Sequence, residues 1–444
     1  MTHKRKLTNY TIFVALVAAI GGVLFGYTAS VISGVLLFIT GEFQLTVVEE
    51  EVIVSTLLIG ALVGALIGGW LTDWLGRKKT LFLTLLLFFI GTLTLTDATG
   101  FETLLVGRLI SGLAVGIVSM AAPLYIAEMS PASNRGALVS LNQLCITIGI
   151  LIAYIVSYYF GETSDWRGMF GFAFIPMAIQ CIGLFFIAET PSWLRTHHKL
   201  QAAEKVLKLI HGSMSASLKE VRQADDASNK KSWHALFAPS VKQPFLIGIG
   251  MAVFQAITGI NTVIYYAPRI FELAGFEKTQ MALFATILVG AINVVITVIA
   301  LWLIDRVGRR PLLITGLIGM AFSLIVLGTT FLFKGDALGL AAVASMLVYV
   351  AFFAVSLGPV AWLIISEVYP LGIRGRAMGI ATFANWTANY IVSLTFLTLI
   401  EQLTITGTFW LYAAICLLSL WFVMVLVPET KGKTFEEIQN FWKK

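Results

Sequence analysis

The chain has 444 residues, of which 58% are hydrophobic and 12% charged, with a formal net charge of +6 and a mean hydropathy of +0.88. A soluble protein carries about 25% charged residues, so this composition excludes an ordinary soluble domain and indicates a polytopic membrane protein. The basic residues lie between apolar runs, so topology explains the positive charge without a nucleic-acid partner. The five histidines form no ligand cluster and the three cysteines lie within apolar runs, so we expect no metal and no cofactor.

The apolar runs are each long enough to cross a bilayer as a helix. The first six lie near residues 10–39, 52–75, 80–97, 102–129, 137–160 and 168–188, and the last six near 244–272, 279–304, 311–333, 338–367, 376–400 and 407–427. In the polar segment between them, short surface helices are predicted at 202–210 and 217–223. We predict an all-α membrane protein of twelve transmembrane helices. Its domains are a six-helix bundle at 1–190, a cytoplasmic helical linker at 191–243, a second six-helix bundle at 244–430 and a cytoplasmic tail at 431–444.

Three motifs recur in the same order in both halves of the chain. The offsets are 232, 239 and 240 positions, which are the differences between residues 305 and 73, 367 and 128, and 429 and 189. The repeated motifs are Asp73-x-x-Gly76-Arg77 with Asp305-x-x-Gly308-Arg309, Glu128-x-x-Pro131-x-x-x-Arg135 with Glu367-x-x-Pro370-x-x-x-Arg374, and Glu189-Thr190 with Glu429-Thr430. Three motifs in one order at nearly constant spacing indicate two homologous halves.

The basic residues also predict the orientation of the chain. Most of the Lys and Arg residues lie in the two tails, the central linker and the loops that carry the repeated motifs, whereas the opposite loops hold acids such as Glu42, Glu49, Glu50 and Glu51. Cytoplasmic loops of membrane proteins carry the excess of Lys and Arg. We therefore expect a multi-pass protein of the cell membrane with both termini in the cytoplasm, surrounded by lipid and working as a monomer.

The charged residues of the repeated motifs are candidates for a latch at the cytoplasmic helix ends. Asp73 and Asp305 lie beside several cations and are expected to pair with Arg135 or Arg374. Exposed pairs contribute only about 0–1 kcal/mol each, which suits a latch that must open in every cycle. The predicted latch residues are Asp73, Arg77, Glu128, Arg135, Glu189, Asp305, Arg309, Glu367, Arg374 and Glu429.

Polar side chains inside the spans are candidates for function, because such groups are costly in hydrocarbon unless they are paired or face water. Arg108 is the only strongly charged residue well inside a predicted span. Each amide taken alone is explained as readily by a hydrogen bond between helices. As a set spread over both halves, however, the amides offer the mixed donors and acceptors that sugar hydroxyls require. The amides are Gln143, Gln255, Asn261, Asn293, Asn385 and Asn389, and Trp362 and Trp386 lie mid-span.

Glycines and prolines interrupt two of the spans. Thr258-Gly259 lies just before Asn261 in the seventh run, and Gly358-Pro359 lies in the tenth. Broken helices of this kind point to a binding site near the midplane of a transporter, although tight packing explains each glycine alone equally well. No nucleophile–base pair or phosphate-binding loop is found, so we expect a transporter and not an enzyme.

The combination of motifs resembles the sugar porter family of the major facilitator superfamily, whose members include glucose facilitators and xylose or glucose–proton symporters. The resemblance covers nearly the whole chain. It rests on the repeated motifs above, Gly107-Arg108-Leu109, Pro123-x-Tyr125-x-x-Glu128, Gln255-x-x-x-Gly259-Ile260-Asn261 with Tyr265-Tyr266, Gly358-Pro359-x-x-Trp362, and Pro428-Glu429-Thr430-Lys431-Gly432.

The resemblance implies the roles of individual residues. A monosaccharide would be bound mainly by Gln143, Gln255, Asn261 and Asn293, with Gly358, Trp362, Asn385 and Trp386 lining the other side. Gate and coupling roles would fall to Thr28, Arg108, Tyr265 and Tyr266.

The sequence departs from the family pattern at three places. Ala256 replaces the second of two adjacent glutamines in the seventh span. The end of the sixth span, Ala188-Glu189-Thr190-Pro191-Ser192, lacks the usual first proline and later arginine, which is expected to weaken a cytoplasmic contact. Proton-coupled members carry aspartate at the position of Thr28, and a hydroxyl does not titrate in the useful range.

We therefore expect facilitated uniport of a monosaccharide, glucose or another hexose, by alternating access. A proton–sugar symporter for a hexose or xylose, with protons as a second partner, is the alternative. A sugar sensor with a transporter fold is a third reading, but the short tails argue against it.

Overall fold

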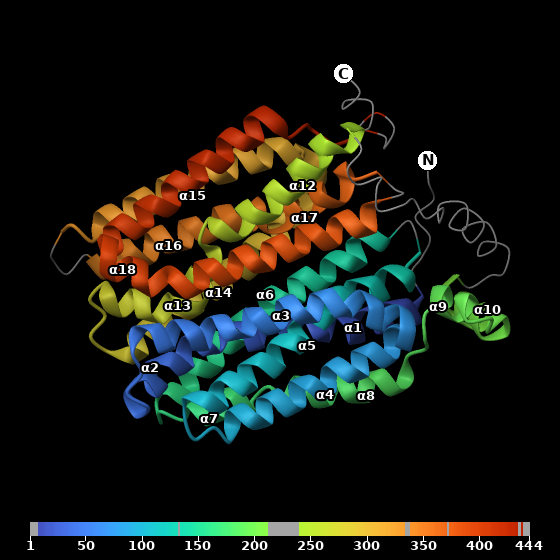
Figure 1. Ribbon diagram of the computed structural model, residues 1–444, viewed down its shortest axis with the longest axis horizontal. Coiled ribbons are helices and arrows are strands. Elements are labelled where there is room, and N and C mark those ends of the chain that lie inside the picture. Colours follow the sequence, from blue (N-terminus) through green and yellow to red (C-terminus); the bar gives the residue numbers. More distant parts are fainter. Residues whose placement is uncertain are drawn as a thin grey trace. The chain divides into compact units, whose positions relative to one another are not determined.

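The computed structural model describes residues 8–131, 134–211, 239–333, 338–370, 373–433 and 437. All its regular elements within these residues are helices (Figure 1). Those of the first half are α1 (Asn9–Ser30), α2 (Ile32–Glu42), α3 (Val47–Leu75), α4 (Arg77–Thr96), α5 (Phe101–Glu128), α6 (Arg135–Gly161), α7 (Trp166–Gly171) and α8 (Phe174–Phe186). Those that follow are α9 (Pro191–Thr196), α10 (Leu200–His211), α12 (Pro239–Ile257), α13 (Ile260–Leu273), α14 (Thr279–Val307), α15 (Arg309–Thr330), α16 (Leu338–Val355), α17 (Leu357–Val368) and α18 (Arg374–Leu426).

The predicted number of spans is confirmed. Within the described residues, eleven helical stretches are long and apolar enough to cross a membrane, and four of them consist of two helices each, such as α1 with α2 and α12 with α13. The last stretch, α18, has 53 residues and turns at Thr404, where φ is 67°. At 1.5 Å per residue it is about 80 Å long, enough for two crossings of a core about 30 Å thick. The eleven stretches therefore contain twelve spans.

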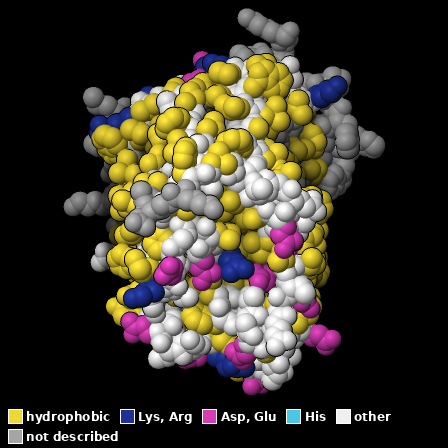
Figure 2. Space-filling model, turned by 90° about the vertical axis from the view of Figure 1, so that its left-hand side faces the viewer, with side chains coloured by type: hydrophobic (Ala, Val, Ile, Leu, Met, Phe, Trp, Pro, Cys, Tyr) yellow, Lys and Arg dark blue, Asp and Glu magenta, His cyan; other side chains and the backbone are white. Residues whose placement is uncertain are grey.

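Large apolar side chains face outward along these helices, which is the arrangement expected for a protein surrounded by lipid. Trp70, Phe185, Trp302 and Phe322 are examples, each more than half exposed. Figure 2 shows hydrophobic side chains over much of one end and its flanks, with Asp, Glu and a few Lys and Arg side chains gathered lower on the same face.

Contacts divide the described chain into two compact units that do not follow the sequence repeat. The first unit holds residues 8–29, Ile59–Ala153 and 167–211, and the second holds Ser30–Leu58, Tyr154–Trp166 and the chain from residue 239 onward. One end of the first, second and fifth spans thus belongs to the same unit as spans seven to twelve. The predicted domains 1–190, 191–243, 244–430 and 431–444 describe the homology of the halves and stay a prediction.

Within the second unit, side-chain hydrogen bonds join residues of the first half to residues of the second. The Tyr154 hydroxyl donates to the Ile264 carbonyl at 2.9 Å, and the Gln280 amide donates to the Tyr158 carbonyl at 3.3 Å. α2 also packs on α13. We call this region the outer end, and it holds residues such as Glu42 and Glu51, away from the repeated motifs.

Glycines permit close helix crossings within the first unit. A Cβ atom on Gly26 of α1 would lie 2.0 Å from the Ile146 carbonyl oxygen of α6, and one on Gly116 of α5 would lie 2.1 Å from the Ala61 carbonyl oxygen of α3. Both contacts are to backbone atoms, which cannot rotate away. Packing therefore explains these two glycines, because small residues at helix interfaces commonly let membrane helices approach closely.

Replacing Gly26 with alanine is accordingly expected to lower the melting temperature in detergent by several degrees, because α1 and α6 must separate. Gly136→Ala is the matched control, since a Cβ atom at Gly136 would meet nothing within 4 Å. Equal melting temperatures for the two variants would contradict the packing role of Gly26.

The central linker is described in part. The predicted helix at 202–210 is confirmed as α10, and a short helix, α9, precedes it. The second predicted helix, at 217–223, lies outside the described residues. The buried face of α10 is formed by Ala203, Val206 and Ile210.

Candidate functional site

The two halves carry the same cluster of charged residues at the start of α4 and of α15. In the first, the Glu189 carboxylate accepts from the backbone N–H groups of Arg77, at 3.0 Å, and Lys78, at 3.1 Å. In the second, the Glu429 carboxylate accepts from the N–H groups of Arg309, at 3.1 Å, and Arg310, at 3.0 Å. The first N–H groups of a helix have no partner within it, so each carboxylate caps a helix N-terminus and also meets its positive dipole end.

A glycine precedes each capped helix for two reasons. Gly76 and Gly308 have φ values of 94° and 110°, which L side chains rarely adopt. A Cβ atom at Gly76 would also lie 2.4 Å from a carboxylate oxygen of Glu189. In the Asp-x-x-Gly-basic motif, the aspartate therefore lies at the end of one helix, the glycine forms a tight turn, and the basic residue begins the next helix, whose N-terminus is capped.

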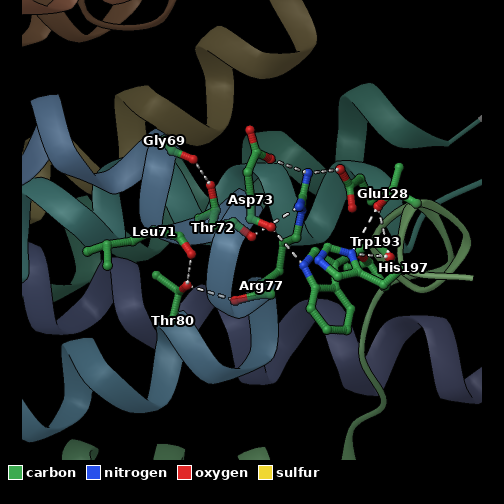
Figure 3. Close-up of polar contacts among 12 residues, drawn as sticks. Gly69, Leu71, Thr72, Asp73, Arg77, Thr80, Glu128, Trp193 and His197 are labelled. Carbon is green, nitrogen blue, oxygen red and sulfur yellow. Dashed lines mark hydrogen bonds and ion pairs between the residues drawn. The ribbon is translucent and has the colours of Figure 1, made fainter. Parts of the chain in front are cut away.

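The arginine of each motif reaches a glutamate on a third helix. Arg77 lies 3.0 Å from Glu128, with only 11% and 14% of the two side chains exposed, and Arg309 lies 3.2 Å from Glu367. Figure 3 shows Arg77 between Asp73 and Glu128. Each cluster joins three elements of its own half, so the structure brings together the predicted Arg77, Glu128 and Glu189, and likewise Arg309, Glu367 and Glu429.

The expected pairing of Asp73 with Arg135 is wrong for this structure. The Asp73 carboxylate, which is 77% exposed, pairs instead with Arg77 at 3.2 Å, because residues four apart lie on one face of a helix. The exposed Arg135 donates to the Ala127 carbonyl at 3.1 Å. Arg374 donates to the Tyr369 carbonyl at 3.4 Å.

The side chain of Asp305 lies outside the described residues. Its backbone forms part of α14. The expected pairing of Asp305 therefore stays a prediction.

The two capping carboxylates differ in their acidity. Burial raises the pKa of Glu189, and its hydrogen bonds from backbone N–H groups offset only part of that effect. Burial acts in the same direction on Glu429, but the backbone N–H groups around it outweigh burial and lower its pKa. As the pH falls, Glu189 therefore takes up a proton before Glu429 does, and the cap of α4 weakens first.

The altered end of the sixth span makes two hydrogen bonds through Ala188. Ala188 stands where the family pattern has proline, and its N–H donates to the Tyr10 hydroxyl at 3.0 Å, a bond that proline could not make. The Ala188 carbonyl accepts from the Tyr125 hydroxyl at 2.5 Å. The expected weakening of a cytoplasmic contact stays a prediction.

The seventh span breaks between α12 and α13, as predicted. Gly259 has a φ of 94°, and a Cβ atom there would meet the Tyr412 ring at 3.0 Å. The Tyr349 hydroxyl donates to the Thr258 carbonyl at 2.8 Å, so the interrupted helix does not leave that carbonyl unpaired. The break places Gln255 before the gap and Asn261 in the first turn after it.

The tenth span breaks at a different residue from the predicted one. α16 ends at Val355 and α17 starts at Leu357, with Ser356 between them at φ −121° and ψ −97°. Gly358 and Pro359 lie in the first turn of α17, where proline is tolerated because its missing N–H has no partner in the helix. Gly358 is buried and Trp362 half-buried in the same helix.

Two amides of the predicted binding set are in contact. The Asn385 side chain donates at 2.7 Å to both the Gln255 side-chain oxygen and the Ala252 carbonyl. The acceptor of Gln255 is therefore occupied, whereas its NH₂ group keeps donors for another partner. Asn293, Asn385 and Trp386 are each at least 90% buried, whereas Gln255 and Asn261 are half-buried.

The eight predicted sugar-binding residues are divided between the two units. Gln143 lies in α6 in the first unit, and the other seven lie in the second unit. Tyr265 and Tyr266 are buried in α13, and the Tyr266 hydroxyl donates to the Ser393 carbonyl at 3.1 Å. Ala256, the departure from the family pattern, is fully buried.

Arg108 uses a backbone carbonyl of the first span. Its side chain is 1% exposed, and a terminal nitrogen donates to the Thr28 carbonyl oxygen at 2.9 Å. The Thr28 hydroxyl is buried and has no hydrogen-bond partner among the described residues. Thr28 therefore serves Arg108 through its backbone, and its side chain offers no group that titrates.

Sequence reasoning missed several buried polar residues. Glu50 and Glu51 are 3% and 2% exposed, although the acidic run around them suggested a loop. Asn142 and Gln180 are buried amides, in α6 and α8. Their positions within apolar runs were a usable signal, whereas the burial of Glu51 was not readable from its neighbours.

The membrane-spanning helical fold and the repeated charged clusters are those of a membrane transporter. Comparison with known protein families identifies the family. The family model described as "Sugar (and other) transporter" matches residues 14–442, so the chain belongs to this family of transporters, which are not enzymes.

Individual relatives agree with this assignment. The chain is 40% identical to the galactose-proton symporter of Escherichia coli K12, over 97% of this chain and 94% of that one. It is 38% identical to the glucose transporter GlcP of Staphylococcus epidermidis, over 98% and 97%. It is also similar to the structure of the xylose transporter XylE from E. coli in a partially occluded inward-open conformation, with a TM-score of 0.85, 34% identity and coverage of 96% and 100%. The predicted family and all-helical class are confirmed.

Proposed function

We propose that this protein carries a monosaccharide, glucose or another hexose, across the membrane by facilitated uniport and alternating access. Galactose, glucose and xylose are the sugars in the names of the relatives, which supports a monosaccharide substrate. We further propose that the termini are cytoplasmic, because the Lys and Arg residues gather on that side, and that the protein works as a monomer.

The observation that carries uniport is the pairing of Arg108 with the Thr28 carbonyl. Proton symport needs a group inside the membrane that titrates as the sugar or the gate moves, and a carboxylate facing an arginine has this property. At the corresponding place this chain has a threonine, and Arg108 is bound by its backbone oxygen at 2.9 Å. Thr28 of the first span thus offers Arg108 a backbone carbonyl dipole and no side-chain proton that could be exchanged during transport.

We propose that the sugar is bound by the amides around the two helix breaks. Gln255 and Asn261 flank the break in the seventh span, and Asn385 orients Gln255 through the bond to its side-chain oxygen. Asn293, Gly358, Trp362 and Trp386 complete this part of the site, and Gln143 is assigned to it through the family resemblance. The indole faces would contact the C–H faces of the sugar ring.

Purified protein in liposomes separates uniport from symport. With an imposed inward proton gradient, we expect the internal sugar concentration to reach the external concentration and stop there. The galactose-proton symporter of E. coli in the same liposomes is the positive control. Accumulation above the external concentration that a protonophore abolishes would refute uniport.

Proton–sugar symport is the second candidate function. The 40% identity to a protein named as a galactose-proton symporter favours it. The liposome experiment decides between the two. A sugar sensor, the third reading, would bind sugar without carrying it, so uptake by the liposomes would exclude it.

A further inference from the structure

A buried carboxylate at the outer end connects the second span to the eleventh. Glu51 of α3 accepts two hydrogen bonds from Thr398 of α18, from the backbone N–H at 2.8 Å and from the hydroxyl at 2.6 Å. The backbone N–H of Leu397 also contributes a hydrogen bond to this carboxylate. Hydrogen bonds to an ionised acceptor are about twice as strong as those between neutral groups.

The partner of Glu51 is unusual because it lies within a helix. A helical N–H ordinarily donates to the carbonyl four residues earlier, and a helical threonine hydroxyl can bond to the same carbonyl. If Glu51 moved away, both groups of Thr398 could therefore bond within α18. The eleventh span would lose no hydrogen bond when the contact opens, so the contact is reversible.

The position of the contact distinguishes it from the two motif clusters. The contacts of Arg77 with Glu128 and Glu189 lie within the first half, whereas Glu51 and Thr398 come from different halves. Nearby, the Tyr266 hydroxyl bonds to the Ser393 carbonyl of the same span.

Other charged groups surround Glu51. Glu401 of α18 and the neighbouring Glu50 lie close enough to interact with it, and so does the Tyr412 hydroxyl of α18. Arg269 and Glu272 of α13 face Glu50. Carboxylates near Glu51 oppose its negative charge, which keeps the contact weak enough to open.

We propose that the Glu51–Thr398 contact is the latch that holds the two halves together at the outer end, so that breaking it is a step in each opening there. The proposal rests on the proposed alternating-access transport. Glu51 acts through the conformation of the protein and not through contact with the sugar.

A cysteine at the interface of the halves reports the opening. Leu283 of α14 is 1% exposed, and its side chain lies against Gly34 of α2 and Gly161 of α6. We would introduce Leu283→Cys after replacing the three native cysteines, and measure its rate of labelling by a membrane-impermeant maleimide in right-side-out vesicles. Opening of the outer end should expose this position.

Glu51→Ala should raise the labelling rate about tenfold, the change expected when a hydrogen bond to a charged group is lost. Glu51→Gln should restore most of the protection, because its amide can accept from the Thr398 N–H and donate to the Thr398 hydroxyl. Thr398→Val should give an intermediate rate, and Thr398→Ser should match the wild type. Combining Glu51→Ala with Thr398→Val should add little to Glu51→Ala alone, as for two partners of one interaction.

Glu49→Ala is the control, because it removes a neighbouring carboxylate of the same helix start that bonds to Thr46 within its own half. Unchanged labelling in Glu51→Ala, or an equal rise in Glu49→Ala, would overturn the proposal. Elution as a single peak in size-exclusion chromatography identifies variants that fold. A wild-type protein that moves no sugar in liposomes would refute the proposed function, whereas the labelling pattern would still decide whether the latch exists.

Discussion

Asn261→Ala and Gln143→Ala are each expected to lower sugar uptake about tenfold at limiting sugar concentration, with unchanged amounts of protein in the membrane. A transport site should bind its sugar weakly, with a Kd near ~1 mM, or about −4 kcal/mol. Loss of one hydrogen-bonding side chain removes about 1–2 kcal/mol, a large share of that affinity. Uptake of labelled glucose into cells that lack their own glucose transport measures the effect.

The structure supports the choice of Asn261 for this experiment. It lies in the first turn of α13 and its side chain is only half-buried. Its removal should therefore leave the fold intact. Gln180→Met is the matched control, because Gln180 is a buried amide of α8 outside the proposed site. Wild-type uptake in both site variants, or equal losses in the control, would remove these residues from the site.

Arg77→Ala is expected to cost about 3 kcal/mol of stability and to lower the melting temperature in detergent by several degrees. Removing one partner of a largely buried ion pair leaves the other charge without compensation, which is more costly than losing an exposed pair. Here Glu128 would lose its arginine partner at a position where its side chain is only 14% exposed. Fluorescence-detected size-exclusion chromatography after heating measures the shift.

Two neighbouring changes serve as controls for Arg77. Asp73→Asn should change the melting temperature little, since Asp73 is 77% exposed and such pairs contribute about 0–1 kcal/mol. Lys78→Ala should also be mild, because Lys78 contacts Glu189 through its backbone N–H. A loss in Asp73→Asn as large as that in Arg77→Ala would show that the exposed pair, and not the buried one, holds the cluster.

The residues of the two charged clusters were readable from the sequence because they belong to motifs that repeat. The equal spacing of the two motif sets predicted two equivalent clusters, and Arg77 and Arg309 have equivalent partners. The partner of Asp73 was predicted wrongly, because a motif gives the residues of a cluster but not their geometry. Arg77 is one helical turn from Asp73, so it competes with any more distant arginine for the ion pair with Asp73.

The sequence by itself determined the membrane class, the twelve spans, the family and the break at Gly259. These follow from hydropathy, spacing and glycine chemistry, which are properties of residues close together in the chain. Only the tertiary structure decided that Ser356 breaks the tenth span, that Arg108 is bound by the carbonyl of Thr28, and that Glu51 is buried against Thr398. Glu51 and Thr398 are 347 positions apart. An acidic run has the same local pattern in an exposed loop and at a packed helix end, so its burial depends on a partner that folding alone brings near.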